Sequence, residues 1–66
     1  MKKITNAEYL RKGDVMVLGG RNRGVWPWDD GKHLTIFAGH IERDWVATLA
    51  DVQDLMDHGI QFERRG

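Results

Sequence analysis

The order of hydrophobic and polar positions predicts short strands through the first half of the chain. The run "DVMVLG", residues 14–19, is rich in apolar and β-branched residues and lies between Gly13 and Gly19, which is typical of a strand buried on both faces or of a short strand in a closed sheet. The segment "GVWPW", residues 24–28, predicts a second strand, and because Pro27 lacks an amide hydrogen its amide side should face an edge or a bulge. After the turn "DDGK", the segment "HLTIFA", residues 33–38, predicts a third strand.

A fourth strand is predicted at "DWVAT", residues 44–48, after a loop near residues 40–43. Antiparallel pairing with the third strand would bury one apolar set on a common face, namely Leu34, Ile36, Ala38, Trp45 and Ala47. Trp45 lies in the middle of its strand, so we expect it to be a core residue whose replacement by Ala costs about 3–5 kcal/mol.

Two segments carry the signs of helices. Thr5 followed by Glu8 has the spacing of a capping box and predicts a short helix near residues 6–11. Thr48 followed by Asp51 repeats this spacing and predicts a helix over residues 49–58. The buried face of this second helix is expected to hold the apolar residues at helical spacing, Leu49, Val52 and Met56.

The last strand is expected at "IQFER", residues 60–64, after Gly59 has ended the second helix, and Arg64 to Gly66 are expected to form a tail. The elements therefore follow one another as helix, four strands, helix and strand. No repeat or linker interrupts them, which predicts a single domain over residues 1–66. The expected fold class is α+β, a small barrel of about five short strands.

The segment "KGDVMVLGGRNRG", residues 12–24, resembles the start of a KOW motif. The matching features are Gly13 and Asp14 at the strand entry, the alternating Val15 and Val17, and a basic loop between Gly20 and Gly24. The order of elements likewise resembles an SH3-like barrel, in which a short helix commonly precedes the last strand. The resemblance implies a module that binds RNA or proteins of transcription and translation, with an exposed loop formed by Arg21, Asn22 and Arg23.

Residue types that are missing from the chain argue against several function classes. Without cysteine, neither a disulfide framework nor a thiolate zinc site can form, and without serine no Ser/His/Asp arrangement exists. The pairs His40 with Glu42 and Asp54 with His58 lack assignable further ligands, so we expect neither a metal site nor a cofactor. A non-enzymatic protein is the resulting expectation.

No apolar run reaches the roughly 18 residues of a membrane span, and the start "MKKITNAEYL" lacks the apolar stretch of a secretory signal. We therefore expect a cytoplasmic protein without a membrane partner.

Charge is unevenly distributed although the formal net charge is zero. Residues 1–24 carry six basic and two acidic groups, whereas residues 25–58 carry two basic and seven acidic groups. A dedicated nucleic-acid binder would carry an overall positive field, so this asymmetry favours protein partners. A solvated surface is an equally good explanation of the charges.

The segment "GGRNRGVWPWDDGK", residues 19–32, holds the residues that we expect to bind a partner: Arg21, Asn22, Arg23, Trp26 and Trp28. Rigid aromatic area beside a guanidinium group is typical of interface hot spots. We expect one of the two tryptophans in the core and the other exposed, since both are hard to bury in so short a chain. An acidic stripe on the second helix is a secondary candidate surface, formed by Asp51, Asp54 and Asp57.

These residues favour a protein-binding module that acts as an adaptor or a stoichiometric inhibitor, and they leave the oligomeric state open, a homodimer included. Two alternatives remain. One is nucleic-acid binding through a stacked Trp with Lys12, Arg21 and Arg23. The other is capture of a small anion by the backbone amides and arginines of the glycine-rich loop.

Overall fold

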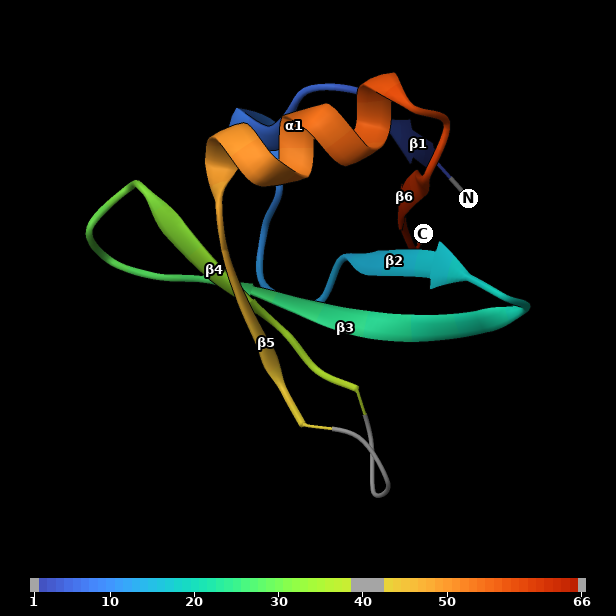
Figure 1. Ribbon diagram of the computed structural model, residues 1–66, viewed down its shortest axis with the longest axis horizontal. Coiled ribbons are helices and arrows are strands. Elements are labelled where there is room, and N and C mark those ends of the chain that lie inside the picture. Colours follow the sequence, from blue (N-terminus) through green and yellow to red (C-terminus); the bar gives the residue numbers. More distant parts are fainter. Residues whose placement is uncertain (1, 39–42, 66) are drawn as a thin grey trace.

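The computed structural model describes residues 2–38 and 43–65. Within them the chain forms one antiparallel sheet, one α-helix and one short 3₁₀ helix (Figure 1). In chain order the elements are β1 (Lys2–Ile4), η1 (Ala7–Tyr9), β2 (Val15–Leu18), β3 (Arg21–Pro27), β4 (His33–Ile36), β5 (Trp45–Thr48), α1 (Leu49–Asp57) and β6 (Gln61–Arg64).

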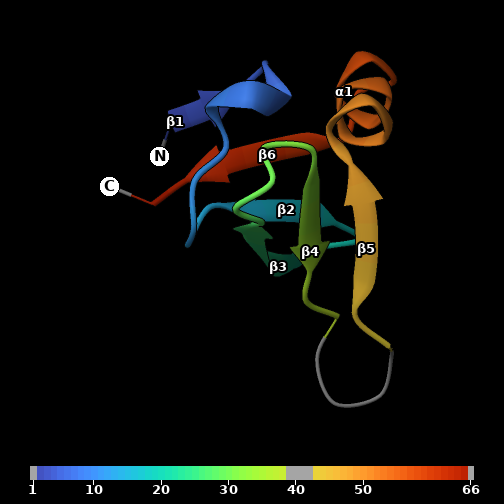
Figure 2. The same cartoon turned by 90° about the vertical axis from the view of Figure 1, so that its left-hand side faces the viewer.

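The strands lie in the order β1-β6-β2-β3-β4-β5, and every neighbouring pair is antiparallel. The strand β3 belongs to two ladders, because its first part, Arg21 to Gly24, pairs with β2 and its second part, Val25 to Pro27, pairs with β4. Figure 2 shows the consequence, which is that β4 and β5 run crosswise to β2 and β6. The predicted α+β class is confirmed. No ladder joins β1 to β5 in the described part of the chain, so the strands form an open six-stranded sheet there, without the pairing that would close the predicted barrel.

Most of the elements predicted from the hydrophobic pattern are present. The strands predicted at 14–19, 33–38, 44–48 and 60–64 correspond to β2, β4, β5 and β6, and the helix predicted at 49–58 corresponds to α1. The second capping box is also confirmed: the Thr48 hydroxyl accepts from the Asp51 amide at 3.1 Å, and the Asp51 carboxylate accepts from the Thr48 amide at 3.3 Å.

The expected glycine-rich loop is a hairpin turn of only two residues, Gly19 and Gly20. Both have positive φ angles, 60° and 76°, as a type I′ turn requires, and Leu18 pairs directly with Arg21. The segment from Arg21 to Arg23 is therefore strand and not loop, which corrects the prediction. A two-residue turn whose twist matches that of the strands is formed by Gly19 and Gly20 alone, so the residues from Arg21 onward pair with β2.

The N-terminal segment also differs from its prediction. Residues Lys2–Ile4 form an edge strand that the sequence analysis did not predict, and the helix expected over 6–11 is the three-residue η1. Its cap is Asn6 rather than Thr5, because the Asn6 side chain accepts from the Glu8 amide at 2.9 Å. Because Ile4 pairs with Phe62, the chain is in extended conformation up to Ile4, and the helical turn begins only at Ala7.

The core lies between the sheet and the helical elements. Six side chains are less than 2 % exposed: Met16, Val25, Leu34, Ile36, Val52 and Phe62. The helix α1 contributes Val52 and packs its partly buried Leu49, Leu55 and Met56 against this cluster, while β1 and η1 add Ile4 and Ala7. The buried face predicted for the helix is thus confirmed at Val52, whereas Leu49 and Met56 lie at its margin.

Trp45 is 43 % exposed and is not the core residue that we expected. Its register is close to the prediction, since it pairs with Ile36 and shares the inward side of β5 with Ala47. However, α1 begins directly after Thr48 and covers only that end of the strand, and Figure 1 shows the other end running away from the helix. Phe62 and Met16 fill the core instead.

Arg64 lies in β6 and is not part of a tail. Its guanidinium forms an ion pair with the carboxylate of Asp14, which is 2 % exposed. A buried carboxylate needs such partners because burial without them is costly. The end of the described chain is thereby joined to the entry of β2.

Candidate functional site

Strand alternation divides the side chains of β3, β4 and β5 between two faces. Leu34, Ile36 and Ala47 point into the core, so the residues between them point outward. The register then places Trp26, Thr35 and Val46 in one row across the outer side of the three strands. We name this side the aromatic face and define it by its large exposed members, Trp26, Trp28, Phe37 and Val46.

The four side chains of the aromatic face are between 40 % and 51 % exposed. Large apolar groups that gather on one solvent-facing surface are a mark of interaction sites, whereas single exposed hydrophobic residues are not. The aromatic face lies on the opposite side of the sheet from the buried residues that α1 covers. The core is therefore complete without it, and its aromatic area is available to a partner.

Contacts within the aromatic face hold its rings in fixed positions. Trp26 and Phe37 meet edge to face, with ring centroids 6.3 Å apart and planes at 83°. The indole Nε1 of Trp28 donates to the hydroxyl of Thr35 at 2.9 Å. The ammonium of Lys12 lies 4.0 Å from the centroid of the Trp26 ring, within the range of a cation–π interaction. A rigid face loses little conformational entropy when it binds.

The turn between β3 and β4 is organised by the carboxylate of Asp30. One oxygen accepts from the amides of Lys32 and His33 at 2.8 and 3.0 Å, and the other lies 2.6 Å from His33 Nδ1. The Lys32 amide, followed by the His33 side chain, lowers the pKa of Asp30 to about 2. The His33 ring in turn stacks at a tilt on Trp28, with centroids 5.1 Å apart. The turn thus supports one edge of the aromatic face.

A shallow depression of about 580 Å³ lies on the aromatic face. It is lined by Trp26, Pro27, Trp28, Phe37 and Thr35, together with two carboxylates, Asp29 and Asp44. Aromatic residues are enriched in protein-binding surfaces. The two carboxylates add a preference for a partner with basic groups.

Both tryptophans lie on the aromatic face, so the prediction that one of them belongs to the core is wrong. Trp26 is 45 % exposed and Trp28 is 44 % exposed. The inward positions of this strand segment are taken by Val25, which is buried, and by Pro27, which is half-buried. Two residues separated by one position share a side of a strand, so the pair is placed together.

The arginines expected beside the tryptophans are placed elsewhere. Arg21 and Arg23 alternate with Trp26 and so fall on the side of β3 that carries Val25. Arg23 is half-buried opposite Met16, whereas Arg21 is exposed next to the hairpin turn. Asn22 is exposed opposite Val17. The basic partner of the Trp26 ring is Lys12 instead.

Phe37 and Val46 are members of the aromatic face that the sequence analysis did not select. The pattern contained the signal: with Leu34 and Ile36 inward, Phe37 must point outward, and Val46 lies between two residues expected to point inward. Their gathering with the tryptophans depends on the pairing of three strands, which the pattern of one segment does not specify.

The acidic stripe of Asp51, Asp54 and Asp57 is exposed on α1, as predicted from the helical period. Each carboxylate also has a local contact: Asp51 is part of the capping box, Asp54 lies 3.5 Å from His58, and Asp57 accepts from Gln53 at 3.2 Å. His58 Nδ1 lies 2.7 Å from the Asp54 carbonyl, and this hydrogen bond, with the Asp54 charge, raises the pKa of His58. These contacts give the stripe a role in helix stability.

No group of three potential metal ligands occurs among residues 2–38 and 43–65, and His40 and Glu42 lie outside these ranges. No helix there has the length and apolar character needed to cross a membrane. Comparisons with protein-family models, with curated proteins and with solved structures found no match for this chain.

Proposed function

We propose that this chain is a small, non-enzymatic protein-binding module whose partner contacts the aromatic face. The observation that carries the proposal is the gathering of Trp26, Trp28, Phe37 and Val46 on one exposed side of the sheet. Aromatic side chains are enriched among the hot spots of protein interfaces, and exposing them costs a small domain part of its limited hydrophobic stabilisation. A binding function explains that arrangement.

A protein partner is favoured over nucleic acid by the charges around the aromatic face. Asp29 and Asp44 are among the residues that line its depression, and their charges would repel a phosphate backbone. The cation–π contact of Lys12 with Trp26 is the one observation that favours the nucleic-acid alternative, since a base could stack where a cation already lies. Arg21 and Arg23 do not add to that surface, because alternation directs them to the other side of β3.

We further propose that the chain is a cytoplasmic protein with an SH3-like fold and that it acts as an adaptor or as a stoichiometric inhibitor. The meander of β2 to β5, the helix before the last strand and the return of β6 beside β2 support the likeness to SH3-like barrels. The absence of cysteine from the sequence supports the cytoplasmic location.

Capture of a partner from extract of the native cells, after nuclease treatment, tests the proposal. We expect Trp26→Ala to weaken the affinity for the captured protein about 30-fold, equivalent to roughly 2 kcal/mol, with most of the change in the dissociation rate. Trp45→Ala is the matched control, since Trp45 has nearly the same exposure but lies off the aromatic face. It should leave the affinity within about twofold of wild type.

Equal loss of affinity in both variants would contradict the proposed face. Loss of capture on nuclease treatment, with binding that weakens steeply between about 50 and 200 mM salt, would favour nucleic acid instead.

A further inference from the structure

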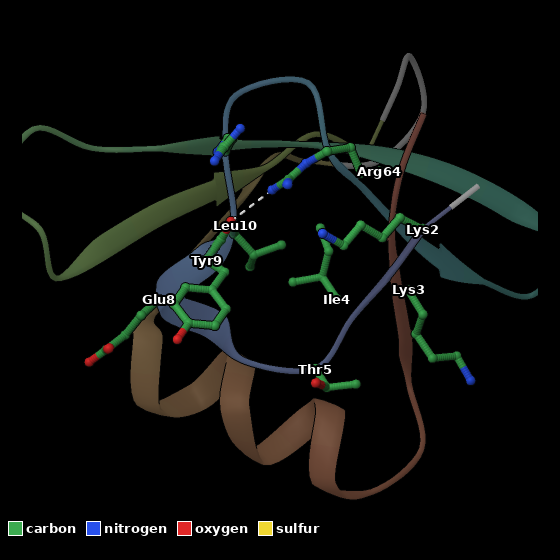
Figure 3. Close-up of a pocket in the computed structure, with 9 residues that line it drawn as sticks. Lys2, Lys3, Ile4, Thr5, Glu8, Tyr9, Leu10 and Arg64 are labelled. Carbon is green, nitrogen blue, oxygen red and sulfur yellow. Dashed lines mark hydrogen bonds between the residues drawn. The ribbon is translucent and has the colours of Figure 1, made fainter. Parts of the chain in front are cut away.

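A second concave site lies between β1 and η1, away from the aromatic face, and has a volume of about 470 Å³ (Figure 3). Its base is apolar, because Ile4 and Leu10 are more than 90 % buried and line it. Four basic side chains but only one carboxylate line the same pocket: Lys2, Lys3, Arg11, Arg64 and Glu8. Figure 3 shows Lys2 reaching over the pocket toward Ile4, while Lys3 and Glu8 point away from it.

Two of these cations are forced together by the sheet. Lys2 pairs directly with Arg64 across the antiparallel ladder, so the two side chains share a face. Like charges that are directly opposite each other destabilise a sheet. The neighbouring pair is complementary, since Lys3 lies opposite Glu63. The like-charged pair of Lys2 and Arg64 is therefore confined to the face that forms the pocket, and the carboxylate of Asp14 offsets the charge of Arg64 there.

Arg64 is held in place independently of any ligand. Its Nε and Nη2 donate to the two carboxylate oxygens of Asp14 at 3.0 and 3.1 Å, and Nη2 also donates to the Tyr9 carbonyl at 2.8 Å. Asp14 is committed as well, because it also accepts from the Arg11 amide at 2.7 Å. Within residues 2–38 and 43–65, Nη1 of Arg64 donates to no protein acceptor. A fixed guanidinium with donors to spare is a preorganised anion-binding group.

We propose that this pocket binds a small organic anion, a carboxylate or phosphate attached to a planar apolar group. The charged group would lie between Lys2 and Arg64, where it would accept hydrogen bonds from the Lys2 ammonium and from the Arg64 donors that Asp14 does not use. The planar group would lie against Ile4 and Leu10, beside the ring of Tyr9, which is 67 % exposed. This site differs in place and in charge from the aromatic face and does not depend on the function proposed for it.

Titration of the ¹⁵N-labelled full chain at constant ionic strength tests the proposal. The probes are adenosine 5′-monophosphate, 1-naphthoate and inorganic phosphate. We expect saturable shifts of the amides from Lys3 to Arg11 with at least one organic anion, at an affinity about tenfold above that of inorganic phosphate. Binding of one organic anion alone identifies whether the phosphate or the carboxylate is the preferred source of the charge.

Lys2→Gln and Lys3→Gln form a matched pair, since they remove the same charge from neighbouring positions on opposite faces of β1. Lys2→Gln should weaken the organic anion about fivefold, and Lys3→Gln should change its affinity by less than about twofold. Without ligand, Lys2→Gln should change the melting temperature by less than about 2 °C, because the carboxylate of Asp14 already offsets the charge of Arg64.

Three results would overturn the proposal: no saturable shift with either organic anion, inorganic phosphate binding as tightly as both, or equal weakening in the two lysine variants. The last result would mean that the basic N-terminal region attracts anions without a defined site.

Discussion

The guanidinium of Arg64 closes on the buried carboxylate of Asp14 through two parallel hydrogen bonds, of 3.0 and 3.1 Å, between residues 50 positions apart. This ion pair connects β6 with the start of β2, and a third bond from Arg64 to the Tyr9 carbonyl adds the end of η1. The hydrogen bonds to Asp14 raise the pKa of Arg64, so the charged form of the guanidinium is favoured further. Three segments distant in sequence are thus joined at one point.

Replacing Arg64 with Gln should destabilise the fold by roughly 2–3 kcal/mol, because among the described residues it leaves the buried Asp14 carboxylate with only the Arg11 amide as a hydrogen-bond partner. The value is below that of a completely buried pair because the Arg64 side chain is 25 % exposed. Urea unfolding followed by tryptophan fluorescence measures the change. Arg65→Gln removes the same charge from the next, exposed position and should be nearly neutral. Similar stabilities of the two variants would show that the ion pair contributes nothing to folding.

Trp45→Ala should cost only about 1 kcal/mol, since the side chain is 43 % exposed. Phe62→Ala should cost roughly 3–5 kcal/mol, because Phe62 is completely buried in the core. Thermal unfolding of the two variants gives the comparison. A larger loss for Trp45→Ala would restore the core position first predicted for Trp45 from its strand.

The stability contributed by Asp30 should disappear in acid. Its pKa is lowered from 3.8 to about 2 by the Lys32 amide and the His33 side chain, so the folded state favours the charged form. That stabilisation is present above the unfolded value and is lost as pH falls through the folded one, between about pH 4 and pH 2. Urea unfolding across this interval should show the wild type losing more stability than Asp30→Asn.

The carboxyl ¹³C shift of Asp30 reports its pKa directly. Asp29→Asn is the control for the acid titration, since it removes the neighbouring charge and leaves the hydrogen bonds of Asp30 in place. A midpoint near 3.8 for Asp30 would refute the proposed cause.

Gly20→Ala should destabilise the hairpin by about 1 kcal/mol, because a φ angle of 76° is unfavourable for a residue with a Cβ atom. Gly24→Ala is the matched control within the same hairpin. Its φ angle is not positive, and the added Cβ would meet Phe37 at 3.6 Å, an ordinary contact. Melting temperatures of the two variants give the comparison. Equal melting temperatures would contradict the tight two-residue turn.

The local pattern was sufficient to predict elements whose signals lie within a few residues. Alternation at Leu34 and Ile36, the capping box of Thr48 with Asp51 and the helical spacing around Val52 all act over short distances, and the structure confirms them. The period of 2 or 3.6 assigns an inner and an outer side before any tertiary contact forms. For the same reason, the outward position of Phe37 was available from the sequence.

Only the tertiary structure decided which of the inward positions are covered and which outward ones gather. Trp45 points inward from its strand, but it lies at the end of β5 that is away from α1, so its side chain stays exposed. Arg64 has a structural role because folding places its guanidinium beside the carboxylate of Asp14. The aromatic face and the pairing of Lys2 with Arg64 likewise depend on strand register over long separations. Residues that are distant along the chain come into contact only when the whole chain folds, and no local periodicity of the sequence specifies those contacts.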